Sequence, residues 1–223
     1  MKNLAIIPAR GGSKRIPHKN IKKFLGKPII AYSIEVAIKS RLFDEVMVST
    51  DDNEIAEIAK QYGAKVPFMR SNESADSFAS ISDVIKEVKT DYLRVNKKFD
   101  NICCILATAP LIKTEYLRKT FSILQDKEID SVRPIVRFSY PIQRAFKLTK
   151  GKVEMFSPQY MNTRSQDLEP AFHDAGQFYW MKYASGLEGS GRYGLEIPES
   201  DLQDIDTEED WKLAEMKYNL IKG

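Results

Sequence analysis

The chain contains few of the residues that form disulfide frameworks and metal clusters, with two cysteines and two histidines among its 223 residues. Cys103 and Cys104 are adjacent inside an apolar segment, so neither has the spaced partners that a disulfide framework or a zinc site requires. His18 and His173 do not stand in the order of a Ser-His-Asp triad. We therefore expect two buried thiols and a chemistry that depends on other residue types.

The chain also lacks long apolar runs and a large excess of one charge. Its first apolar segment is short and leads directly into basic residues, which argues against a signal peptide or a membrane span and favours a cytoplasmic protein without a membrane partner. The net charge of +3, from 34 basic and 31 acidic residues, does not favour a nucleic-acid partner. The length suits one domain over residues 1–223.

The most informative feature that is present is a basic loop, residues 6–20, with the sequence IIPARGGSKRIPHKN. It follows a short apolar strand, and its glycines, Gly11 and Gly12, let consecutive backbone N–H groups turn toward an anion. Neither the Walker pattern nor GxGxxG is present. The loop predicts a polyphosphate site at the carboxyl end of a strand, and the alternatives are a solvated basic loop or a nucleic-acid patch. Its basic side chains are Arg10, Lys14, Arg15 and Lys19.

Strand and helix patterns alternate through the first half of the chain. Apolar segments predict strands over 4–7, 45–49, 65–68 and 102–106. Amphipathic patterns between them predict three helices. The first starts with Pro28 as its first helical residue, the second starts at a capping box of Asp51 and Glu54, and the third spans 80–95. This alternation predicts an α/β fold in which a Rossmann-like, mostly parallel sheet carries helices on both faces.

From residue 130 onward the pattern changes to short segments separated by Pro, Gly and Ser. These segments, 132–138, 144–148 and 153–156, predict a small antiparallel excursion from the sheet at about 138–172 that mediates dimerisation. The chain then closes with a helix capped by Thr207 and Asp210.

Two carboxylates precede this last helix. In an extended segment Asp204 and Asp206 point the same way, while Ile205 between them faces the core. A pair of carboxylates suits Mg²⁺, which prefers hard oxygen ligands together with water and substrate phosphates. The alternative is that one aspartate only assists helix capping.

Five segments in this order make the chain resemble the nonulosonate cytidylyltransferases, which activate sialic acid and related sugars with CTP. They are IIPARGGSKRIPHKN, VSTDDNEIAEIA over 48–59, ATAP over 107–110, RSQDLEPAFHDAGQFYW over 164–180 and QDIDTEEDW over 203–211. The resemblance implies a sheet of the nucleotidyltransferase type, a homodimer and Mg²⁺ as cofactor. It also implies an enzyme that transfers CMP from CTP to the anomeric hydroxyl of a nonulosonic acid and releases pyrophosphate.

One departure from the family pattern bears on the sugar. Sialic acid synthetases usually carry a glutamine that contacts the sugar where this chain has Leu106. A more apolar wall fits pseudaminic acid, which has a second acylamino group and a methyl group, and which is used to glycosylate flagella. Sialic, legionaminic and 3-deoxy-manno-octulosonic acids are the rival sugars. A CTP-binding module without catalysis is the rival of another class.

The resemblance also implies roles for individual residues. Lys14 would stabilise the charge that develops on the α-phosphate, with Arg10 beside it, and Asp204 and Asp206 would hold Mg²⁺. The triphosphate would also contact Gly12, Ser13, Lys19 and Asn20.

The base and the sugar have their own expected contacts. Arg70 and Ser80 would read the cytosine ring, and Arg164 would bind the sugar carboxylate through a forked contact. A second side chain is expected to help bind this carboxylate, with Arg144 as the first candidate and Gln143 as the alternative. An aromatic cluster, Phe172 and residues 178–180, could contribute to the apolar wall, but we expect at least two of its four rings to fill core instead. The remaining residues expected to contact substrate are Thr108, Gln166, His173 and Phe178.

Overall fold

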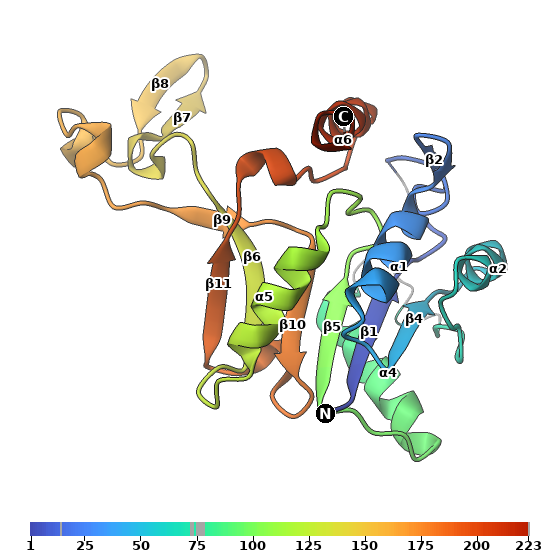
Figure 1. Ribbon diagram of the computed structural model, residues 1–223. Helices are drawn as coiled ribbons and strands as arrows, with labels where there is room; N and C mark the ends of the chain where they lie inside the picture. The colour runs from blue at the N-terminus through green and yellow to red at the C-terminus, as the bar shows by residue number, and fades with distance from the viewer. Residues whose placement is uncertain (14, 72–73, 75–78, 223) are drawn as a thin grey trace.

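Within residues 1–13, 15–71, 74 and 79–222, which the computed structural model describes, a seven-stranded sheet carries helices on both faces (Figure 1). The strand order is β11-β6-β10-β5-β1-β4, with β9 paired to β6. The bounds of these strands are β1 Asn3–Pro8, β4 Glu45–Ser49, β5 Asn101–Ile105, β6 Ser131–Arg137, β9 Phe172–Asp174, β10 Phe178–Lys182 and β11 Arg192–Glu196. Parallel pairing joins β4 to β1, β1 to β5 and β6 to β11, while β10 and β9 run antiparallel to their neighbours. The prediction of a mostly parallel sheet is confirmed.

The helices divide the core between the two faces of the sheet. Strand β1 alternates, with Ala5 and Ile7 in the cluster under helices α1, α2 and α5, and Leu4 and Ile6 in the cluster under α4. All four side chains are fully buried, as expected for a parallel strand covered on both faces. The helix bounds are α1 Ile29–Ser40, α2 Asn53–Gln61, α4 Ile81–Arg94, α5 Thr114–Leu124 and α6 Glu208–Lys222.

Three local predictions need correction. Residues 65–68 form no strand: only Lys65 bridges to Met47, and farther along the chain the backbone N–H of Arg70 donates to the carbonyl oxygen of Thr50. Pro28 is the N-cap of α1 and not its first helical residue. Helix α2 is capped by Asp52, whose Oδ1 accepts hydrogen bonds from the backbone N–H groups of Glu54 and Ile55, so the neighbouring Asp51 is free for another role.

Helix α6 closes the fold over the N-terminal basic loop. Its apolar face, with Trp211 and Ala214, packs against Phe24 of the short hairpin β2 (Lys23–Phe24) and β3 (Lys27–Pro28). The same cluster contains Ile16 of the basic loop and Ile205, and neither side chain is accessible to solvent. The loop and the segment before α6 are therefore tied to one small core, although they come from opposite ends of the chain.

A separate hairpin lies away from the main sheet (Figure 1). Strand β7 (Phe146–Thr149) pairs with β8 (Lys152–Met155), in the segment that leaves the sheet after β6 and returns at β9. Four of its apolar side chains are largely exposed: Phe146, Leu148, Val153 and Phe156. The position of this segment agrees with the predicted excursion, and its role in dimerisation stays a prediction.

Candidate active site

The carboxyl ends of β1, β4 and β5 meet at one edge of the sheet because these strands are parallel neighbours. A cavity of about 470 Å³ lies at this edge. This volume is in the range of small-molecule sites. Seven residues predicted from the sequence line it: Arg10, Ser13, Lys19, Asn20, Arg70, Ser80 and Thr108. Fold topology has thus brought together side chains from four separate segments of the chain.

The basic loop is held in place by its own buried residues. The Asn20 side chain is buried and donates from Nδ2 to the carbonyl oxygen of Arg10, at 2.9 Å. At the other side of the loop, the backbone N–H of Gly11 donates to Oδ1 of Asp51, at 2.9 Å. A Cβ on Gly11 would come within 2.7 Å of Oδ2 of Asp52, so the loop approaches the start of α2 closely at this point. Gly12, by contrast, is exposed and faces open space.

Arg70 lines the cavity next to Ser49, the last residue of β4. Its guanidinium donates from Nη2 to the Ser49 carbonyl oxygen at 2.7 Å and from Nε to the Ser49 hydroxyl at 3.1 Å. Burial lowers the pKa of Arg70, although the nearby carboxylate of Asp51 opposes this shift. An arginine keeps its proton at neutral pH. The fork thus fixes a half-buried cation in the lining of the cavity.

Ser80 has a structural role in addition to its place in the cavity. Its hydroxyl accepts from the backbone N–H of Asp83 at 3.2 Å, and the backbone N–H of Ser80 donates to Oδ2 of Asp83 at 2.9 Å, which completes a capping box at the start of α4. The predicted contact of Ser80 with cytosine stays a prediction.

The two predicted metal ligands lie next to the basic loop. Oδ1 of Asp206 is 2.8 Å from Nη2 of Arg15 and 3.6 Å from Nζ of Lys19, two side chains that line the cavity. Burial, and then the charge of Asp206, raise the pKa of Asp204. Ile205 between them is fully buried, as predicted for an extended segment, and its carbonyl oxygen accepts from Nζ of Lys19 at 2.6 Å. A divalent ion between the two carboxylates would offset their mutual repulsion, and carboxylate oxygens are ligands that Mg²⁺ prefers. The donor set therefore fits Mg²⁺.

Several predicted contacts lie elsewhere. Arg144 lines a cavity of about 740 Å³ on the excursion, and Gln166 one of about 410 Å³ at its base. Arg164 is exposed at the start of a short 3₁₀ helix, and the His173 ring lies 4.9 Å from that of Phe138. These four do not line the cavity at the sheet edge, as far as the described residues define it.

Two aromatic residues predicted from the sequence lie in the core. Phe178 is fully buried in β10 and belongs to the core cluster under α1 and α5, so its predicted contact with substrate is corrected to a packing role. Trp180 is equally buried, in agreement with the prediction that at least two rings of the aromatic cluster fill core. Lys14 lies outside the described residues.

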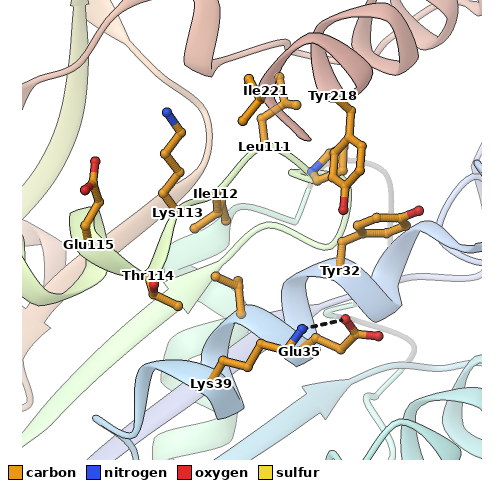
Figure 2. Close-up of a pocket in the computed structure, with 12 residues that line it drawn as sticks. Tyr32, Glu35, Lys39, Leu111, Ile112, Lys113, Thr114, Glu115, Tyr218 and Ile221 are labelled. Carbon is orange, nitrogen blue, oxygen red and sulfur yellow. Dashed lines mark hydrogen bonds and ion pairs between the residues drawn. The ribbon is translucent and has the colours of Figure 1, made fainter. Parts of the chain in front are cut away.

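A different cavity, of about 350 Å³, lies between α1, the start of α5 and the end of α6 (Figure 2). Its polar lining includes Glu35, whose Oε2 is 3.3 Å from Nζ of Lys39, and Lys113 at the far side (Figure 2). It contains none of the residues predicted to bind substrate.

The sequence reasoning missed two aspartates. Asp51 was predicted only as part of a capping box, yet its carboxylate holds Gly11. Its position directly after a strand that neighbours β1 is a signal that would have found it, because the carboxyl ends of parallel neighbours converge. Asp201 carried no local signal, since its partners Lys113 and Tyr116 are 88 and 85 positions away.

Comparison with known proteins fits this geometry. A family model described as cytidylyltransferase matches residues 4–182, a span that includes the basic loop and the strands that form the cavity. The chain belongs to the cytidylyltransferase family. Among the described helices, none is long and apolar enough to cross a membrane.

Curated relatives of this cytidylyltransferase match it over nearly all or over part of its length. A pseudaminic acid cytidylyltransferase of Campylobacter jejuni is 43% identical over 99% of this chain and 97% of its own length. A CMP-N,N'-diacetyllegionaminic acid synthase of Legionella pneumophila is 50% identical over 40% of this chain and 37% of its own length. A solved CMP:2-keto-3-deoxy-manno-octonic acid synthetase in complex with CTP has a TM-score of 0.70, covers 100% of this chain and 99% of its own, and is 16% identical. This last likeness confirms the predicted nucleotidyltransferase-type fold.

Proposed function

We propose that this cytidylyltransferase transfers CMP from CTP to the anomeric hydroxyl of a nonulosonic acid, with pseudaminic acid as the sugar. The observation that carries the proposal is the convergence of Arg10, Lys19 and Arg70 on one cavity, where the lining residues Arg15 and Lys19 also pair with Asp206, two positions after Asp204. Such a site combines cations for a polyphosphate with carboxylates for a metal ion. The 43% identity to the Campylobacter jejuni pseudaminic acid cytidylyltransferase supports the choice of sugar.

The reaction needs no protein nucleophile. The oxygen of the sugar's anomeric hydroxyl forms a bond to the α-phosphorus of CTP, the bond from this phosphorus to the bridging oxygen breaks, pyrophosphate leaves, and the hydroxyl proton passes to solvent. Catalysis of this kind depends on positioning and on charge neutralisation. The side chains of Arg10, Ser13 and Lys19 have the chemistry and the location to bind phosphate oxygens. Lys14, assigned from sequence, would act on the α-phosphate.

Asp204 and Asp206 are the residues that would hold Mg²⁺. When bound, this ion would neutralise phosphate charge and assist departure of pyrophosphate. Arg15 and Lys19 neutralise Asp206 in the structure, so binding of a cation there requires that at least one of these contacts lengthen. Substrate phosphates and water would complete the ligands.

The base and sugar sites follow from the walls of the cavity. Arg70 and Ser80 would bind the polar edge of cytosine, and Leu106 would give the sugar an apolar neighbour, since it lines the same cavity as Thr108. Arg164, Arg144, Gln166 and His173 lie on or beside the excursion and would reach the sugar only if this segment or a partner copy approaches the cavity.

A homodimer fits the surface of the excursion. Exposed apolar side chains on a hairpin outside the main sheet are typical of an interaction surface. We propose that two copies associate through this hairpin. Sedimentation that gives a monomer at working concentration would exclude the dimer.

We also propose that the enzyme acts in the cytoplasm, where CTP is made.

The direct test of the activity is incubation with CTP, Mg²⁺ and pseudaminic acid, followed by mass spectrometry. The expected products are pyrophosphate and a CMP-linked sugar in equal amounts. ATP, GTP and UTP serve as controls and should give little product. Binding of CTP without either product would favour the rival function, a CTP-binding module.

A further inference from the structure

Asp201 is a buried acid that the proposed mechanism does not use. It ends a short 3₁₀ helix, η5 (Glu199–Asp201), three positions before Asp204, and only 4% of its surface is exposed. Oδ2 of Asp201 accepts a hydrogen bond from Nζ of Lys113 at 2.6 Å and another from the hydroxyl of Tyr116. Both donors belong to the start of α5, which packs on the central sheet. The carboxylate therefore ties the chain just before the aspartate pair to a helix that packs on the central sheet.

Other contacts hold the backbone of the same segment. The carbonyl oxygen of Asp201 accepts from Nε2 of Gln177, at 2.6 Å, and Gln177 is itself buried beside the end of β5. The carbonyl oxygen of Leu202 accepts from Nζ of Lys217 in α6, at 2.8 Å. Lys19 binds the carbonyl oxygen of Ile205, whose side chain is buried. The segment 201–205 is thus fixed at both ends by side chains from other elements.

Holding the segment 201–205 in place would favour metal binding by Asp204 and Asp206. Asp204 and Asp206 stand two positions apart with the buried Ile205 between them, so their like charges repel each other in the absence of a cation. A flexible segment would relieve this by moving them apart. Functional groups need to be held within about 0.5 Å of their productive geometry, so an anchor next to the pair favours metal binding.

We propose that Asp201 is a positioning residue that keeps Asp204 and Asp206 in the geometry that binds the divalent cation. It acts through the backbone of 201–205 and does not touch the ion, since its carboxylate is engaged by Lys113 and Tyr116. Lys113 lies at the edge of the cavity of Figure 2, on the side of α5. This inference rests on the proposed metal-dependent function.

The chain contains a matched control. Glu45 at the start of β4 is also buried, and it too accepts from a tyrosine hydroxyl, that of Tyr92, and from the lysines Lys65 and Lys97. It lies at the amino end of its strand, whereas the cavity lies at the carboxyl end. Loss of either acid should destabilise the fold, but only loss of Asp201 should affect metal binding.

The experiment compares Asp201→Asn, Glu45→Gln and the unchanged protein. Mn²⁺ is titrated into each protein in the presence of saturating CTP, and free Mn²⁺ is measured by electron paramagnetic resonance. In parallel, pyrophosphate release is measured against Mg²⁺ concentration. We expect Asp201→Asn to bind Mn²⁺ about 10- to 100-fold more weakly, the range found for residues that orient metal ligands, and to recover most of its kcat at high Mg²⁺. Glu45→Gln should keep the affinity of the unchanged protein.

The results distinguish the positioning role of Asp201 from the proposed metal-dependent activity. Equal Mn²⁺ affinity and equal Mg²⁺ dependence in Asp201→Asn and the unchanged protein would overturn the positioning role while leaving the function intact. An unchanged protein that binds no Mn²⁺ with CTP and releases no pyrophosphate would overturn both. If Asp201→Asn does not fold, Tyr116→Phe, which removes one donor only, should still weaken Mn²⁺ binding.

Discussion

The guanidinium of Arg15 lies 2.8 Å from the carboxylate of Asp206, so the basic loop near the N-terminus is paired with the segment before the last helix. Lys19 reinforces this connection, since its Nζ binds the carbonyl oxygen of Ile205 and lies 3.6 Å from Asp206. Both side chains line the cavity at the sheet edge. The residues proposed to bind phosphate and those proposed to bind the metal ion are therefore in direct contact.

Replacement of Asp206 tests this arrangement. Asp206→Asn should lower Mg²⁺-dependent pyrophosphate release at least 100-fold, because an amide cannot supply the negative charge that the metal ion needs. Stability should change by less than about 1 kcal/mol, since Arg15 is largely exposed and exposed ion pairs contribute little. Urea unfolding and the pyrophosphate assay measure the two effects. Near-normal activity in this variant would contradict the metal assignment.

The adjacent glycines of the basic loop should differ in their tolerance of a side chain. A Cβ on Gly11 would meet Oδ2 of Asp52 at 2.7 Å, and Asp52 cannot easily move because it caps α2. Gly11→Ala should therefore destabilise the protein by about 1–3 kcal/mol, as overpacking does elsewhere. Gly12→Ala is the matched control, with no atom within 4 Å of the added carbon, and should leave stability nearly unchanged. Equal unfolding midpoints for the two variants would show that the loop does not have this geometry.

The buried Glu45 predicts a pH dependence of stability. Burial alone would raise its pKa, but hydrogen bonds from Lys97, Tyr92 and Lys65 lower it overall below the ordinary value of 4.5. A lowered folded-state pKa means that Glu45 stabilises the fold above about pH 4.5 and that this contribution is lost as pH falls through the lower folded-state value. Glu45→Gln should cost about 1–3 kcal/mol at pH 7 and progressively less below pH 4.5. Urea unfolding at a series of pH values checks this, and a cost that does not depend on pH would be inconsistent with it.

Leu106 tests the basis of sugar choice. It lines the cavity, and a glutamine there would add a polar group to an apolar wall. Leu106→Gln should lower kcat/KM for pseudaminic acid about 10-fold or more relative to sialic acid, since a polar group left without a hydrogen-bond partner in a pocket costs about 1–3 kcal/mol. Leu106→Met keeps the wall apolar and serves as the control. If the ratio of kcat/KM for pseudaminic acid to that for sialic acid is the same in both variants, Leu106 does not determine the choice of sugar.

The sequence predicted the parts of the molecule in which local pattern and burial agree. The apolar segments of β1, β4 and β5 became buried parallel strands, and Ile205 faced the core between two outward carboxylates. Parallel pairing then brought the basic loop to Arg70, which explains why most residues assigned to CTP from the sequence line one cavity.

The sequence could not supply features that depend on distant partners. Residues 65–68 have the composition of a strand, but only Lys65 pairs with a neighbour, and local composition does not determine how far such a pairing extends. Phe178 looks like a candidate for a sugar pocket until its partners in the core are known. Asp201 has no motif of its own, and its significance comes from donors on α5 that approach it only in the folded chain.

The most direct test of the central claim is a competition among sugars. Pseudaminic, legionaminic, sialic and 3-deoxy-manno-octulosonic acids are offered together with CTP and Mg²⁺, and the CMP-linked products are separated by mass and quantified against pyrophosphate. We predict that CMP-pseudaminic acid forms in the largest amount and that total product equals pyrophosphate. No CMP-linked product from any of the four sugars, in a protein that binds CTP, would contradict the account.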